Sequence, residues 1–107
     1  MNLEITVDDL KTQLASAIPP LLLDVREPWE YDTAHIEGST LMPMGDVPRR
    51  AFHELDEDKP ILVLCHHGAR SLSVAVWLRN QGFPYAQSVA GGIDAWSRTI
   101  DPHIPRY

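Results

Sequence analysis

The residues of this chain most able to do chemistry lie together around a single cysteine. Cys65 ends an apolar run and is followed by His66, His67, Gly68, Ala69, Arg70 and Ser71. A thiolate is a strong nucleophile, and it is favoured by the amides of a short glycine-containing loop, by a helix N-terminus and by the charge of Arg70. Such a loop suits a thiolate, a persulfide sulfur, or an oxyanion of sulfur or phosphorus.

This segment has two other interpretations. A lone cysteine at a strand end is often a small buried hydrophobe, but Gly68, Arg70 and Ser71 at these spacings favour a reactive thiol. A zinc site needs about four convergent ligands, whereas adjacent side chains point in different directions and the other histidines are scattered. We therefore expect no metal and no cofactor, and we expect His66 and His67 to tune the charge of the loop or to face solvent.

The surrounding pattern predicts an α/β domain with Cys65 at the end of a strand. Apolar runs predict strands at 21–25 and 61–64, with weaker ones at 38–42 and 88–89. Capping residues, prolines and helical spacing predict helices that start near Thr6, Pro28, Asp46, Ser71 and Ile93. Ligands of open α/β sheets bind beyond the carboxyl ends of the strands. The core is expected to contain the three tryptophans, Trp29, Trp77 and Trp96. A tight turn is expected at two adjacent glycines, Gly91 and Gly92.

Length and charge limit the classes of function. The chain has 107 residues, so one domain over 1–107 is expected. A formal net charge of −6 argues against a nucleic-acid or anionic-membrane partner. No apolar run approaches a membrane span and the N-terminus lacks the features of a secretory signal, which favours a cytoplasmic protein. One cysteine cannot form an internal disulfide.

Further motifs follow one another in order along nearly the whole chain. They are Leu22-Leu23-Asp24-Val25-Arg26-Glu27, then Glu30-Tyr31 and His35-Ile36-Glu37-Gly38-Ser39, then Cys65 to Ser71, and last Val89-Ala90-Gly91-Gly92-Ile93-Asp94-Ala95-Trp96. Together they resemble the motifs of the single-domain rhodanese (thiosulfate sulfurtransferase-like) family. The resemblance implies a rhodanese-like three-layer α/β/α fold with a five-stranded parallel sheet.

The resemblance also implies a sulfurtransferase that carries sulfane sulfur on Cys65 as a persulfide. The donor would be thiosulfate or a persulfide, and the acceptor cyanide, a thiol or a protein. By this resemblance Cys65 is the nucleophile, residues 66–71 bind substrate, and Arg70 attracts an anionic donor. Asp24 and Arg26 would support the loop from the neighbouring strand end, although a structural ion pair fits these two residues equally well.

The sequence leaves two alternatives from other functional classes open. Cysteine-based phosphatases and arsenate reductases of the related fold have a longer loop than the one between Cys65 and Arg70, and a shorter loop suits a single sulfur better than a phosphoryl group. A non-catalytic interaction module of the same fold usually lacks the cysteine, which is present here.

Overall fold

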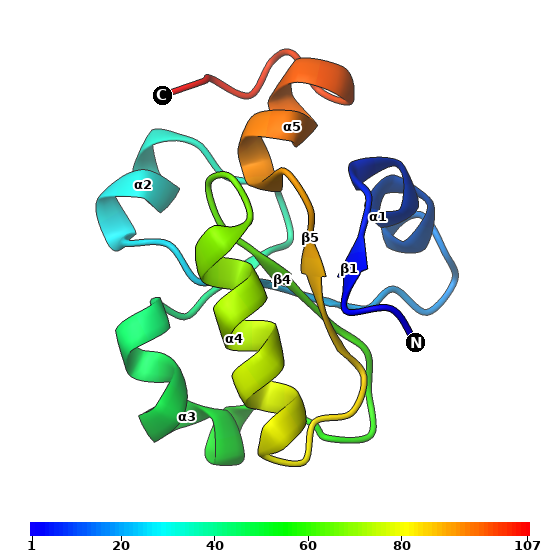
Figure 1. The fold of residues 1–107 in the computed structure, drawn as a ribbon. Coiled ribbons are helices and arrows are strands. Elements are labelled where there is room, and N and C mark those ends of the chain that lie inside the picture. Colours follow the sequence, from blue (N-terminus) through cyan, green and yellow to red (C-terminus); the bar gives the residue numbers. More distant parts are fainter.

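All strands of the computed structural model, which describes residues 1–107, pair in parallel within one sheet. The strand order is β1-β5-β4-β2-β3, and β1, β5 and β4 are labelled in Figure 1. The strands are β1 Glu4–Ile5, β2 Leu21–Asp24, β3 Thr40–Leu41, β4 Ile61–Leu64 and β5 Ala86–Val89. The central strands β4 and β2 carry the apolar runs, because strands covered on both faces must be apolar throughout.

Helices connect these strands. They are α1 Val7–Leu14, α2 Pro28–Thr33, α3 Val47–Glu54, α4 Ala69–Asn80 and α5 Gly92–Thr99, with a short 3-10 turn η1 Met44–Asp46 before α3. Thr6 caps α1, since its hydroxyl accepts the N–H of Asp9 at 3.1 Å, as the sequence predicts. None of the helices combines the length and apolar character that a membrane span needs.

The sheet separates two apolar cores, which makes the fold three-layered. Leu23 and Val63 belong to the cluster that includes residues of α3 and α4. Their chain neighbours Leu22 and Leu62 belong to a second cluster with residues of α1 and α5. Successive strand residues point to opposite faces, so each central strand serves both cores. The predicted α/β architecture with a five-stranded parallel sheet is confirmed.

The elements differ from the sequence prediction in a few places. The sequence prediction does not include strand β1, because its two residues, Glu4 and Ile5, make too short a run to indicate a strand. Trp96 is buried, as expected, and Trp77 is half-buried. The placement of Trp29 in the core is wrong, because this residue of α2 is 62% exposed. Val76 of α4 is also exposed.

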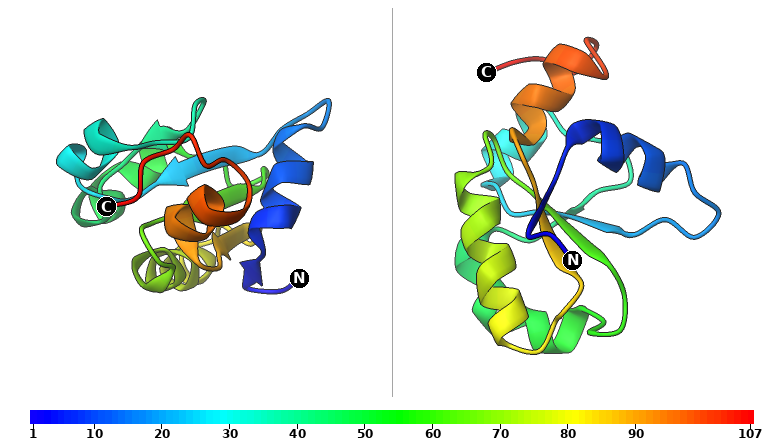
Figure 2. Two further views of the ribbon diagram at one scale, coloured as in Figure 1. Left: turned by 90° about the horizontal axis from the view of Figure 1, so that it is seen from above. Right: turned by 45° about the vertical axis from the view of Figure 1, so that its right-hand side comes forward.

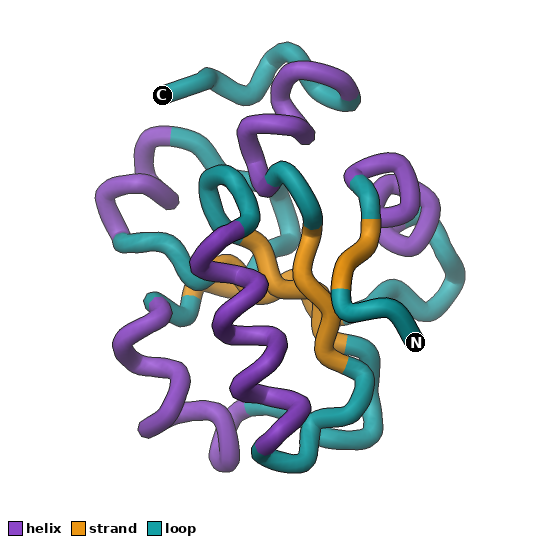
Figure 3. Tube along the Cα trace, in the orientation of Figure 1, coloured by secondary structure: helices purple, strands orange, loops and turns teal.

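The parallel strands bring the candidate residues to one edge of the sheet. Cys65 follows β4, Arg26 lies two residues beyond β2, and Gly91 lies two residues beyond β5. Loops gather at this edge, at the top of the view in Figure 3. Figure 2 shows that the C-terminal segment returns from α5 across the same edge towards α2.

Gly92 forms the expected tight turn and brings the start of α5 against the loop that follows β4. It has a φ of +58°, and a Cβ there would collide with the carbonyl oxygens of Cys65 and His66. This close approach lets the N–H groups of Ile93 and Asp94 donate to the carbonyls of Cys65 and His66, at 2.9 and 3.1 Å. The first turn of α5 therefore fixes the start of the loop that follows β4.

Gly92→Ala should lower the free energy of unfolding by about 2 kcal/mol or more, because it adds a left-handed backbone penalty to a clash with backbone atoms. Gly45→Ala is the matched control, since nothing lies within 4 Å of a Cβ there and its φ is not positive. Urea denaturation of both variants measures the difference. Equal stability of the two variants would show that the contact of α5 with the loop does not constrain the backbone.

Candidate active site

The sulfur of Cys65 is surrounded by hydrogen-bond donors from its own loop. Sγ accepts the N–H of Gly68 at 3.1 Å and the N–H of Ser71 at 3.3 Å. Gly68 has a φ of +111°, which turns the chain back towards the sulfur at the start of α4. Cys65 is 1% exposed and packs within an apolar core, yet its sulfur has polar partners that a simple apolar filler would not need. The loop can therefore stabilise negative charge on this sulfur.

Two buried serines extend these contacts. Ser71 Oγ lies 3.3 Å from Cys65 Sγ, 3.2 Å from the carbonyl oxygen of Gly68 and 2.8 Å from Ser88 Oγ. In the thiol form, the S–H can donate to Ser71 while the Ser71 hydroxyl donates to Gly68. When the thiol loses its proton, the Ser71 hydroxyl can turn to donate to the sulfur. The serine pair can thus serve both protonation states of Cys65.

Arg70 forms a two-bond ion pair with Glu30 of α2. Its Nη1 donates to Oε1 of Glu30 at 2.7 Å and its Nη2 to Oε2 at 2.9 Å. The carboxylate raises the pKa of Arg70 above its ordinary value. The side chain of Arg70 is 35% exposed, whereas that of Glu30 is 5% exposed. The permanent charge predicted beside Cys65 is present, but in this structure it is compensated by a buried carboxylate.

The carboxylate of Glu30 accepts four hydrogen bonds. Besides the two bonds from Arg70, Oε1 accepts the backbone N–H of Glu27 at 3.0 Å and Oε2 accepts the hydroxyl of Tyr107 at 2.8 Å. The hydrogen bonds from Arg70 are the main reason that the pKa of Glu30 falls to about 2. Glu30 is therefore ionised throughout the neutral range and restrained in position.

Tyr107 links three parts of this edge. Its hydroxyl accepts from Nη1 of Arg26 at 2.8 Å and donates to Glu30. Its ring stacks on His66, with centroids 4.0 Å apart, and meets the ring of Trp29 edge-on. Burial raises the pKa of Tyr107 to about 12, so the hydroxyl keeps its proton at neutral pH. The C-terminal segment therefore packs against the loop after Cys65.

Asp24 and Arg26 form a fully buried pair whose hydrogen bonds do not reach the loop directly. Nη2 of Arg26 donates to Oδ2 of Asp24 at 2.7 Å and to the carbonyl oxygen of Ala34 at 2.7 Å. Its Nη1 reaches Tyr107 and the carbonyl oxygen of Glu30. Arg26 is thus connected to the loop only through Glu30 and Tyr107, and neither Asp24 nor Arg26 is exposed to a ligand.

The two loop histidines converge, contrary to the expectation that they point apart. The rings of His66 and His67 lie 3.9 Å apart, and ligand atoms of both lie within 4.8 Å of Asp94. The two oxygens of Asp94 accept from Arg106 and Arg98, each at 3.0 Å. A cation at this cluster would have to displace both arginines. Burial lowers the pKa of His66, and its Nε2 has no hydrogen-bond partner.

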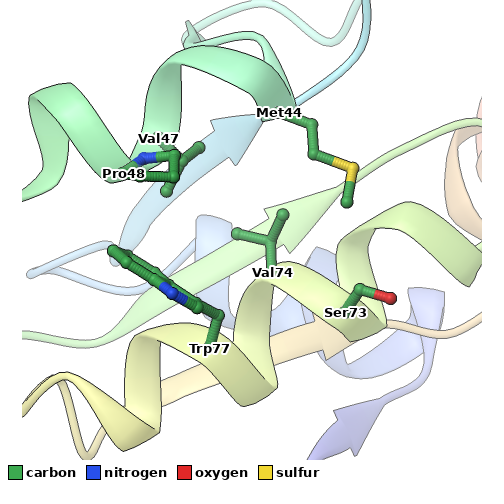
Figure 4. Close-up of a pocket in the computed structure, with 6 residues that line it drawn as sticks. All are labelled: Met44, Val47, Pro48, Ser73, Val74 and Trp77. Carbon is green, nitrogen blue, oxygen red and sulfur yellow. The ribbon is translucent and has the colours of Figure 1, made fainter.

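No deep pocket is lined by Cys65 or by the loop that follows it. A cavity of about 270 Å³ lies between α3 and α4 (Figure 4), and none of residues 65–71 lines it. Its walls are mostly apolar, and Trp77 and Val74 of α4 point towards Val47 and Pro48 of α3. The groups that contact the sulfur of Cys65 therefore come from the loop and not from a pocket.

The sequence alone assigns no role to three residues of this site. Glu30 belonged to a recognised motif, and its pairing with Arg70 could have been suspected from the need to neutralise a loop arginine. Ser88 was placed on a strand, but nothing in the sequence indicated its contact with Ser71. No sequence pattern indicates that Tyr107 belongs to the site, because its contact with Glu30 joins residues far apart in the chain.

The depressed pKa of Glu30 should make stability depend on acid pH. A carboxyl group with a lower pKa in the folded state stabilises the fold fully above its unfolded pKa, and this contribution is lost as the pH falls through the folded value. For Glu30 the window runs from 4.5 down to about 2. The excess stability of the wild-type protein over Glu30→Gln should shrink across this window in urea denaturation. An excess that is constant from neutral pH down to about pH 3 would contradict this origin.

Comparisons with known proteins agree with this geometry. The model of the rhodanese-like domain matches residues 6–99. The chain is 36% identical, over 97% of its length, to the chloroplastic rhodanese-like/PpiC domain-containing protein 12 of Arabidopsis thaliana, and it spans 37% of that protein. It is 38% identical, over 88% of its length, to the Bacillus subtilis (strain 168) protein named "Putative sulfur carrier protein YrkF", and it spans 50% of that protein.

Solved structures show the same fold. The crystal structure of a rhodanese-like domain protein from Staphylococcus aureus superposes with a TM-score of 0.84 at 28% identity, and 99% of each chain is covered. The chain itself spans half or less of the length of the two curated relatives. The matched family model covers most of the chain and includes the strand, the loop and both helices that surround Cys65. The chain therefore belongs to the family of rhodanese-like domains.

Proposed function

We propose that this domain is a sulfurtransferase that carries sulfane sulfur on Cys65. The observation that supports it most is the set of contacts to the Cys65 sulfur: two loop amides and the Ser71 hydroxyl surround one atom at a strand end. A relative named as a sulfur carrier is consistent with this function. The donor is thiosulfate or a persulfide, and the acceptor is a thiol, a protein thiol or cyanide.

The reaction proceeds by two displacements. The Cys65 thiolate attacks the outer sulfur of thiosulfate, the sulfur–sulfur bond of the donor breaks, and sulfite leaves with the bonding electron pair. The terminal sulfur of the resulting persulfide then transfers to a nucleophile such as cyanide, which releases thiocyanate and regenerates the thiolate. Covalent storage divides one transfer into two easier steps. The N–H groups of Gly68 and Ser71 donate to Sγ of Cys65 and stabilise its negative charge in the thiolate state, whereas the charge of the persulfide lies one bond further out, on the outer sulfur.

The alternatives are disfavoured by particular features. A phosphoryl group presents three oxygens that each need donors, whereas the described amides converge on the sulfur of Cys65. A non-catalytic module would not require a nucleophile or polar contacts to it. Both alternatives predict that no sulfur is stored on Cys65.

Incubation with thiosulfate should add one sulfur atom, about 32 Da, to the intact protein, because the attacking thiolate keeps the outer sulfur. Intact-mass spectrometry measures the addition. The added mass should be removed by cyanide and should be absent in Cys65→Ser. Absence of the adduct with both thiosulfate and a persulfide donor, or its persistence in Cys65→Ser, would reject the proposed function.

Arg70→Ala should lower kcat/KM for thiosulfate by about 10- to 150-fold, because it removes the permanent cation of the loop and leaves the buried anion of Glu30 unpaired. Arg70→Lys should restore only part of the activity, since an ammonium group cannot form the two parallel bonds of a guanidinium. Steady-state kinetics at varied thiosulfate concentration distinguishes these outcomes. An unchanged kcat/KM in Arg70→Ala would remove Arg70 from the donor site.

A further inference from the structure

The cations near Cys65 are already paired with acids in this structure. Arg70 is bound through two bonds to Glu30, and Arg26 is bound to Asp24. Arg98 and Arg106 share the carboxylate of Asp94, and their side chains are about half exposed, where solvent and salt screen their charge. The loop therefore offers amide donors to a ligand but little uncompensated positive charge.

The carboxylate that neutralises Arg70 cannot easily move away. Its two oxygens together accept four hydrogen bonds, from Arg70, Glu27 and Tyr107, and Glu30 is 4% exposed. Tyr107 is itself restrained by the buried guanidinium of Arg26. Release of Arg70 to an external anion would leave Glu30 as a buried charge without its main partner, which is unfavourable.

This arrangement acts differently on donors of different charge. Thiosulfate carries two negative charges and gains most from a free guanidinium, whereas a hydropersulfide carries at most one. A ligand that needs a binding-competent state populated at about one tenth loses about tenfold in apparent affinity. A donor held mainly by the loop amides does not bear this loss.

We propose that Glu30 is a specificity-determining residue that, by neutralising Arg70, favours hydropersulfide donors over thiosulfate. The inference rests on the proposed function. In the favoured reaction the Cys65 thiolate attacks the outer sulfur of R–S–SH, the donor sulfur–sulfur bond breaks, and the thiolate R–S⁻ leaves with the electron pair. Cys65 then carries the sulfur together with the donor's proton, so no oxidant or reductant is needed.

The test measures single-turnover persulfidation of the full chain by intact mass, with thiosulfate or with the hydropersulfide of 2-mercaptoethanol at several concentrations. Glu30→Gln removes the charge while keeping the size of the side chain. It should raise the second-order rate constant with thiosulfate about five- to twentyfold and change that with the hydropersulfide less than about twofold.

Glu54→Gln is the matched control, because it makes the same change in net charge in another carboxylate–arginine pair, with Arg50, on the exposed surface of α3. It should leave both rate constants unchanged. Should Glu30→Gln fail to fold, Glu30→Asp provides the test, since its shorter side chain keeps at most one of the two bonds to Arg70. It should raise the thiosulfate rate constant by a smaller factor.

Three results would overturn the specificity role of Glu30. They are an unchanged thiosulfate rate constant in the folded Glu30 variant, an equal gain with both donors, or an equal gain in Glu54→Gln. In each of these cases Cys65 still becomes persulfidated, so the proposed function stands. Absence of persulfidation of the wild-type protein by both donors instead rejects the proposed function and the inference with it.

Discussion

The hydrogen bonds from the backbone of Gly68 and Ser71 to the sulfur of Cys65 are the interaction on which the rest of the site depends. Backbone donors hold a sulfur only while the chain keeps its curvature, so the surrounding structure must fix the loop. Strand β4 fixes its start, helix α4 fixes its end, and the first turn of α5 holds the carbonyls of Cys65 and His66. The parallel sheet brings these three elements to one edge.

The ionic contacts at this edge support the loop from outside. Asp24 and Arg26 form a buried pair, and Glu30 and Tyr107 connect that pair to Arg70. Truncation of one member would leave a buried charge unpaired, which usually costs more than the intact pair contributes. The network therefore positions the loop, and it also reduces the charge that the loop presents to a ligand.

Local sequence patterns predict part of the fold and of the candidate site. The apolar runs ending at Asp24 and Cys65 define two strands, and the segment from Cys65 to Ser71 carries its own chemistry, so the α/β class and the loop follow from nearby residues. The five-stranded sheet was expected only from the resemblance to rhodaneses. The placement of Trp29 in the core is wrong because composition alone does not say which face of a short helix is buried. The contact of Tyr107 with Glu30 depends on the path of the C-terminal segment across the sheet edge, which no local pattern encodes.

The central claim is the proposal that the amides of this loop, which donate to Sγ of Cys65, also hold the sulfur that is added to it. Nitrogen–proton correlation spectra of the protein before and after persulfidation test it most directly. The amide resonances of Gly68 and Ser71 should shift when the sulfur is added and return when cyanide removes it, while that of Gly45, outside the loop, should stay in place. If the mass shows the added sulfur but the resonances of Gly68 and Ser71 do not move, the loop does not hold it and the account is contradicted.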